Sequence, residues 1–153
     1  MEYESIEREI FIAASPEVVF DVVSRPEHMT EWWSDEADFP LDGAPGQIVF
    51  HGTEPGADKV VPVVTIDLIR PQRFSFRWDF PPGLEPTADN SLLVTFELEA
   101  SGNGTLLRMS EIGFRERGWE AAVLEANYRE HAAGWDFFIP RIGEYVDRLV
   151  STS

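Results

Sequence analysis

The chain has 153 residues, of which 28 are acidic and 12 basic, so its formal net charge is −16. Such a charge repels nucleic-acid phosphates and anionic lipid surfaces, and both are therefore excluded as expected partners. Because the chain has no cysteine, disulfide bonds, thiolate metal sites and a cysteine nucleophile are excluded as well.

The first predicted element is a half-buried strand at residues 3–12, where isoleucines at even positions are separated by glutamates. The sequence Ser-Pro-Glu at 15–17 then predicts a helix start. The serine can cap the helix, the proline suits its first position, and the glutamate complements the positive end of its dipole. This short helix ends before Pro26, which can start a second short helix that runs through Trp33.

Short apolar runs separated by turn signals follow, and this pattern predicts an antiparallel sheet. The strand at 73–80 is the clearest, because aromatic and polar side chains alternate along it. The sequence Gly-Asn-Gly at 102–104 is typical of a hairpin turn. After the first strand, the expected strands are 47–51, 60–69, 73–80, 92–99 and 105–114.

The last third of the chain predicts one long amphipathic helix. Apolar side chains recur at spacings of three and four residues from about Leu124 to Leu149. A helix of that length would span ~39 Å at the usual rise per residue. Pro140 lies inside it and removes one backbone hydrogen bond, so we expect a kink at residues 136–140.

Together these elements predict one α+β domain that covers residues 1–153. We expect a curved antiparallel sheet of about six strands wrapped around the long C-terminal helix, with two short helices after the first strand. One helix is only ~10–12 Å wide and cannot fill the concave face of such a sheet. The remaining space is either filled by large side chains or left as a cavity.

The N-terminal sequence MEYESIERE is charged and lacks the apolar segment of a signal peptide. No apolar run approaches the ~20 residues that span a bilayer. We therefore expect a cytoplasmic protein that does not contact a membrane.

Segments from the whole chain carry a family resemblance. They are IEREIFIAASPEVVFDVV and RPEHMTEWWS near the start, RPQRFSFRW and GNGTLLRMSEIGF in the sheet, and HAAGWDFFIPRIGEYVDRL in the last helix. The sequence resembles the START-like helix-grip superfamily (SRPBCC). The closest branch contains bacterial relatives of the C-terminal domain of the activator of heat-shock protein 90 ATPase. The most specific features are the Trp32-Trp33 and Gly134-Trp135 pairs.

The resemblance implies a helix-grip fold with a mostly apolar cavity between sheet and helix. Across the superfamily such cavities hold lipids, polyketides or hormones, and a minority of members are cyclases or other enzymes. The branch name implies a possible chaperone partner and a role in the stress response. Many bacterial members lack the N-terminal domain of the eukaryotic co-chaperone, and we expect the same here.

Large apolar side chains are the best candidates for cavity walls, although each taken alone is also an ordinary core residue. Adjacent helical residues point about 100° apart, so one helix face cannot bury Trp32 and Trp33 equally. We expect one to pack in the core and the other to lie near the cavity mouth. The cavity-lining candidates are Trp32, Trp33, Phe50, Phe74, Phe76, Trp78, Phe80, Met109, Glu111, Trp135 and Phe138.

Glu111 is the sharpest polar candidate, and its orientation depends on the register of its strand. If Leu107 and Met109 face inward, strand parity places Glu111 in the apolar interior, where it could exchange a proton or orient a ligand. The other register turns Leu106 and Ile112 inward and leaves Glu111 in solvent. The sequence leaves both registers open.

No metal or cofactor is expected. The three histidines, His28, His51 and His131, match no metal-binding spacing and are expected on the surface or at its boundary. The chain also lacks a nucleophile elbow and a phosphate-binding loop. The acidic stretch 35–38 is expected to be solvated surface.

The leading functional hypothesis is a non-enzymatic domain that binds a small hydrophobic molecule between the sheet and the C-terminal helix. Glu111, Arg77 and His51 are possible orienting groups. The alternatives are a protein-interaction or co-chaperone module, and a cyclase- or hydratase-like enzyme that uses the cavity. No catalytic residue is assigned, and the oligomeric state is left open.

Overall fold

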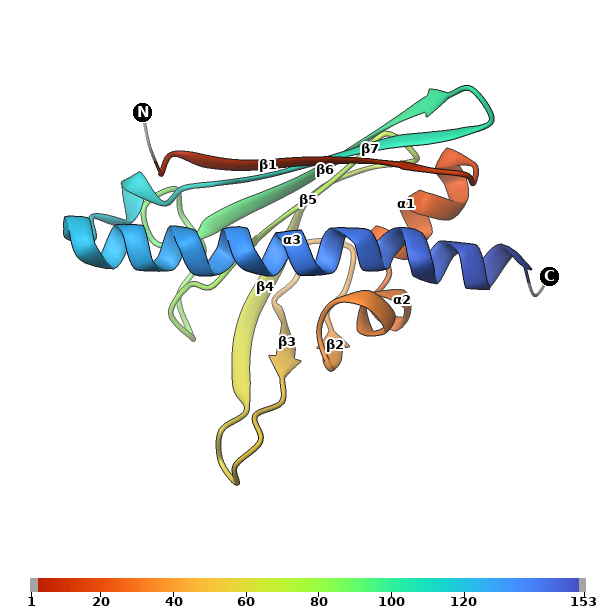
Figure 1. The fold of residues 1–153 in the computed structure, drawn as a ribbon. Helices are drawn as coiled ribbons and strands as arrows, with labels where there is room; N and C mark the ends of the chain where they lie inside the picture. Colours follow the sequence, from red (N-terminus) through yellow and green to blue (C-terminus); the bar gives the residue numbers. More distant parts are fainter. Residues whose placement is uncertain (1–2, 152–153) are drawn as a thin grey trace.

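In the computed structural model, which describes residues 3–151, seven antiparallel strands form one sheet with the order β1-β7-β6-β5-β4-β3-β2. A long C-terminal helix crosses this sheet, and two short helices lie near one end of it (Figure 1). The strands are β1 (Ser5–Ile12), β2 (Glu36–Asp38), β3 (Gly46–Phe50), β4 (Lys59–Ile69), β5 (Arg73–Trp78), β6 (Leu92–Ser101) and β7 (Gly104–Ile112). The helices are α1 (Pro16–Ser24), α2 (Pro26–Trp32), the 3-10 helix η1 (Arg115–Arg117) and α3 (Ala121–Ser151).

This architecture confirms the predicted α+β helix-grip class, with one additional strand. The extra strand, β2, pairs with residues 47–49 of β3 at the edge of the sheet. Its residues belong to the acidic stretch that was expected to be surface only, and Glu36 and Asp38 are indeed exposed. Exposed acidic side chains are compatible with an edge strand, because only its backbone must pair.

The strand predicted at 73–80 ends earlier than expected. Phe74, Phe76 and Trp78 face the core along β5, as their alternation predicts. Asp79 then adopts a left-handed backbone conformation with a φ of 62°, which an extended strand does not permit. The chain therefore changes direction before Phe80.

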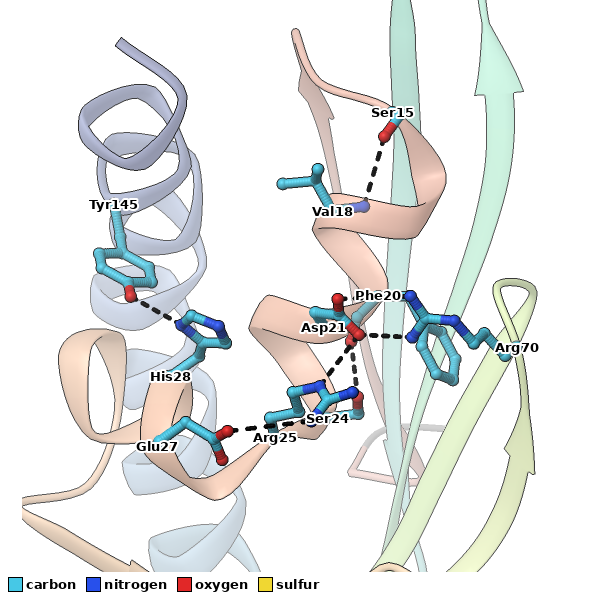
Figure 2. Close-up of polar contacts among 10 residues, drawn as sticks. All are labelled: Ser15, Val18, Phe20, Asp21, Ser24, Arg25, Glu27, His28, Arg70 and Tyr145. Carbon is cyan, nitrogen blue, oxygen red and sulfur yellow. Dashed lines mark hydrogen bonds and ion pairs between the residues drawn. The ribbon is translucent and has the colours of Figure 1, made fainter. Parts of the chain in front are cut away.

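The start of α1 follows its sequence signals. The Ser15 hydroxyl oxygen accepts a hydrogen bond from the Val18 amide at 3.4 Å, and Pro16 occupies the first helical turn. Figure 2 shows that Asp21 on this helix forms an ion pair with Arg70, from the turn between β4 and β5. The hydrogen bond from Arg70 holds the pKa of Asp21 below its usual value, although burial opposes this effect. The ion pair thus fastens α1 to the sheet.

The long helix α3 is held to its neighbours along its length. Near its start, the Tyr128 hydroxyl donates to the backbone oxygen of Ser5 at 2.6 Å. Further along, Asp136 accepts from Arg8 on β1 at 2.6 Å. Towards its end, the Tyr145 hydroxyl lies 2.7 Å from Nδ1 of His28 on α2 (Figure 2). These contacts hold α3 against β1 and α2, and α3 also packs against α1. The strands β3 and β4 extend away from α3 (Figure 1).

Pro140 does not end α3, because the helix continues through it to Ser151. Both Pro140 and Asp136, whose backbone carbonyl loses its helical partner, are exposed. Water can therefore satisfy that carbonyl at little cost. The local kink expected at 136–140 stays a prediction. None of the helices within residues 3–151 is long and apolar enough to cross a bilayer.

One core lies between the sheet and α3. The helix contributes Trp135, Ile139, Ile142 and Val146, which recur at the predicted spacing and are all buried. Phe96 on the interior strand β6 is fully buried and makes edge contacts with the rings of Trp32 and Trp135. The core therefore joins the sheet, α2 and α3 through aromatic rings.

We predict that Phe96→Ala lowers the free energy of unfolding by ~3–5 kcal/mol, because it leaves a cavity in this closely packed region. Phe137→Ala is the control, since Phe137 lies on α3 with 60% of its surface exposed. It should change the same quantity by less than about 1 kcal/mol. Urea unfolding of both variants measures the difference, and equal losses would contradict the described core.

Candidate functional site

A pocket of about 300 Å³ lies between α3 and the β3–β5 part of the sheet, and it is partly open to solvent. The pocket lies on the part of the concave face where β3 and β4 extend away from α3. Its walls are mainly aromatic, with polar groups at a few positions. The lining residues are Trp33, Phe50, Lys59, Trp78, Glu130, His131, Gly134, Trp135 and Phe138.

The structure divides the predicted cavity-lining residues into several groups. Trp33, Phe50, Trp78, Trp135 and Phe138 line the pocket. The other large candidates lie elsewhere: Trp32, Phe74, Phe76 and Met109 are packed in the core, and Phe80 borders a separate surface cleft with Pro82 and Leu84. Protein side chains thus fill much of the concave face, and the turn at Asp79 takes Phe80 away from the pocket.

The adjacent tryptophans fit together because the helix ends between them. Trp32 is the last residue of α2, whereas Trp33 has non-helical backbone angles. Trp32 is fully buried and donates its indole N–H to the backbone oxygen of Val22 at 2.9 Å. Trp33 stacks on the Trp32 ring, with 5.8 Å between centroids, and on the Trp135 ring at 5.3 Å. One ring therefore belongs to the core and the other to the pocket wall.

Glu111 faces inward, which settles the register of β7. Leu107 and Met109 are buried on the same face, and Glu111 has no exposed surface. Ile112, which the other register would bury, is 44% exposed. Glu111 lies behind the pocket wall, because it is not among the lining residues.

Both carboxylate oxygens of Glu111 receive hydrogen bonds from aromatic side chains. The indole N–H of Trp78 donates to Oε2 at 2.7 Å, and that of Trp135 donates to Oε1 at 2.8 Å. Nδ1 of His131 lies 3.0 Å and 3.2 Å from the same two oxygens. An indole nitrogen can only donate, so both oxygens must accept, as an ionised carboxylate does. These donors compensate for the loss of water around a buried charge.

His131 was expected on the surface or at its boundary, and it lies at that boundary, close to the core. Its side chain is only 9% exposed, and its ring lies beside those of Trp78 and Phe114. A signal was present in the sequence, because His131 precedes Trp135 by four residues and helical residues at that spacing share a face. The sequence analysis did not consider a pair between His131 and a carboxylate on another element.

Burial alone would lower the pKa of His131. The hydrogen bond with Glu111 and the negative charges of Glu111, Asp79 and Glu130 outweigh burial and raise this pKa above its ordinary value of 6.5. The proton is therefore held to higher pH than on an isolated histidine. The pocket thus has mainly aromatic walls, and His131 is the ionisable group in them that pairs with the buried Glu111.

The two other proposed orienting groups lie outside the pocket. Arg77 donates to the Ser91 hydroxyl and the Thr87 backbone oxygen, on the face of β5 opposite the core. His51 is exposed and forms a 2.6 Å contact with Glu36. No group of three or more potential metal ligands occurs within residues 3–151.

The chain is similar to known proteins over most of its length. Residues 13–147 match the family described as "Activator of Hsp90 ATPase homolog 1-like protein". No curated protein matches the chain. Protein MLL2253 from Mesorhizobium loti is 21% identical, with a TM-score of 0.73 over 94% of this chain and 97% of its own.

Two further solved structures share the fold. Aha1 from Colwellia psychrerythraea, solved as a dimer, is 19% identical with a TM-score of 0.68, over 93% of this chain and 95% of its own. DynU16, from the dynemicin biosynthetic locus, is also 19% identical with a TM-score of 0.70, over 94% of this chain and 47% of its own. At such identities these structures show the fold alone, and this fold is the helix-grip fold that the resemblance implied.

We predict that Glu111→Gln destabilises the protein by about 3 kcal/mol or more, because the amide group must turn its own N–H groups towards one of the indole donors. Glu97→Gln is the matched control, since Glu97 is exposed on the neighbouring strand β6. Its free energy of unfolding should stay close to that of the unmodified protein. Urea unfolding at neutral pH measures both, and a Glu111→Gln variant of unchanged stability would contradict the described network.

Proposed function

This chain belongs to the activator of Hsp90 ATPase homolog 1-like family, and we propose that it is a non-enzymatic domain that binds a small hydrophobic molecule in the pocket beside α3. The observation that carries this proposal is an aromatic pocket that remains partly open beside a filled core. Burial of apolar ligand surface, at about 25 cal/mol per Å², would supply most of the affinity.

The size of the pocket limits the ligand. A volume of about 300 Å³ corresponds to roughly ten water molecules at liquid density. A compound with one or two rings fits this space, whereas a long lipid chain would extend into solvent. The ring of Trp33 contacts the rings of Trp78 and Trp135, and flat apolar molecules can stack on such surfaces.

The arrangement of Glu111 favours binding over catalysis. An acid or base that acts on a substrate must reach it directly or through one water molecule. Both oxygens of Glu111 already accept indole hydrogen bonds, and the residue lies behind the pocket wall. We therefore assign Glu111 to holding the pocket walls in position and rank the cyclase- or hydratase-like alternative below binding.

Gly134 offers a direct test, because it lines the pocket in the middle of α3 and a Cβ built there would meet no atom within 4 Å. We predict that Gly134→Leu fills the pocket and weakens binding of the apolar probe ethylnaphthalene. The same change should raise the free energy of unfolding by up to about 1 kcal/mol, since leucine favours a helix more than glycine does.

Gly143→Ala is the control, because Gly143 also lies within α3 but outside the pocket, and its added Cβ would make only an ordinary contact with Ile10. It should bind the probe as the unmodified protein does. Calorimetric titration measures affinity, and urea unfolding measures stability. Failure of the unmodified protein to take up the probe, or equal affinity in Gly134→Leu, would contradict the proposed function.

A co-chaperone role is the second candidate, and the family match favours it together with the similarity to the Colwellia Aha1 dimer. A surface with a net charge of −16 would bind a basic region of a chaperone through interactions that weaken with salt. This role would use the outer surface and would not require the pocket.

The co-chaperone role predicts that the protein increases the ATPase rate of heat-shock protein 90 from the same cells, and that added salt reduces the effect. Gly134→Leu should increase the rate as much as the unmodified protein, because its changed side chain faces the pocket. No increase in ATPase rate, together with no capture of the chaperone in a pull-down, would rule out this candidate.

A further inference from the structure

The two ring nitrogens of His131 have different surroundings. Nδ1 lies within hydrogen-bonding distance of both Glu111 oxygens. Nε2 makes no hydrogen bond to any of the residues that the structure describes, and His131 is part of the pocket wall. Nine-tenths of the side chain is buried, and Nε2 does not belong to the fully buried side-chain atoms that lack a partner. It therefore keeps some accessible surface, and an occupant of the pocket can bind to it.

The contact with Glu111 fixes the tautomer of His131. The Glu111 oxygens accept, so Nδ1 carries a hydrogen in both the charged and the neutral ring. In the charged ring Nε2 also carries a hydrogen and donates. In the neutral ring Nε2 has only a lone pair and accepts. Loss of one proton therefore changes the hydrogen bond that the pocket offers from a donor to an acceptor.

The charges around His131 favour an uncharged ligand. Glu111 balances the charged ring, and Asp79 and Glu130 add negative charge nearby. Lys59 is an exposed cation in the wall of the same pocket, and Arg117 donates to the backbone oxygen of Asp79. The positive charge of the His131 ring is already neutralised by Glu111, so it would not attract a carboxylate ligand strongly. The net charge of −16 on the chain would also repel such a ligand.

We propose that His131 is a specificity-determining residue which selects small uncharged aromatic carbonyl compounds, whose carbonyl oxygen accepts a hydrogen bond from Nε2–H. This inference rests on the proposed binding function. The preference is present while His131 is protonated and is lost as the pH rises and the ring becomes neutral. The raised pKa of His131 keeps the donor form to higher pH than in an isolated histidine.

Three probes of similar shape test the proposal: the ketone acetylnaphthalene, its hydrocarbon analogue ethylnaphthalene, and the carboxylate naphthoate. Calorimetric titration is carried out at about pH 6, below the ordinary pKa of histidine, and at about pH 9, well above it. At the lower pH the ketone should bind roughly tenfold more tightly than the hydrocarbon, because only the ketone can accept a hydrogen bond from the charged ring of His131. At the higher pH the two should bind equally, while affinity for the hydrocarbon stays constant.

Two substitutions assign the effect to His131. His131→Asn retains a donor for Glu111 but has no atom in the place of Nε2, and His131→Phe retains the ring beside Trp78 and Phe114. In both variants the ketone and the hydrocarbon should bind equally at either pH. His51→Asn is the control, because it alters an exposed histidine–carboxylate pair outside the pocket. It should preserve the preference for the ketone.

The outcomes separate this inference from the function on which it rests. Equal binding of ketone and hydrocarbon to the unmodified protein at both pH values would overturn the role of His131 and leave the apolar pocket in place. Tighter binding of naphthoate than of the ketone would overturn the preference for uncharged ligands. Binding of none of the probes would overturn the proposed function, and this inference with it.

Discussion

One buried carboxylate determines how the sheet and the long helix meet. Glu111 on β7 is removed from water, and its hydrogen-bonding partners come from β5 and α3. A buried charge without partners costs several kcal/mol, so the strand and the helix must bring their donors to one point. Those donors are side chains of the pocket wall. The requirement to satisfy one charge therefore fixes the rings that shape the site.

The pocket is what remains after the protein has filled most of its concave face. Aromatic rings from the end of α2, the sheet and α3 occupy the centre, and the unfilled space lies between α3 and the ends of β3, β4 and β5. Gly134 helps to keep that space open, because it lines the pocket and an added Cβ would meet no atom within 4 Å. A glycine in mid-helix costs about 1 kcal/mol relative to alanine, and here its lack of a side chain leaves room in the site.

Periodicity predicted the order of the elements and most of their bounds, because strands and amphipathic helices leave repeating patterns in a sequence. It could not place β2, which has only three residues and no alternation of apolar and polar side chains. It could not orient Glu111 either, because apolar residues occur on both faces of β7. His131 was missed because its partner lies on another element, and pairing between distant segments leaves no local pattern. The stacking of Trp33 depended on where α2 ends, and element ends are the least certain part of such a prediction.

The position of the donors along the chain has a consequence for synthesis on the ribosome. Two of the three side chains that satisfy Glu111 belong to α3, the final element of the fold. A growing chain that has completed its sheet therefore still carries an unsatisfied carboxylate among exposed aromatic rings. Such surfaces promote aggregation of partly folded chains. The nascent protein cannot complete its core, or the hydrogen bonds of Glu111, until α3 has emerged from the exit tunnel of the ribosome.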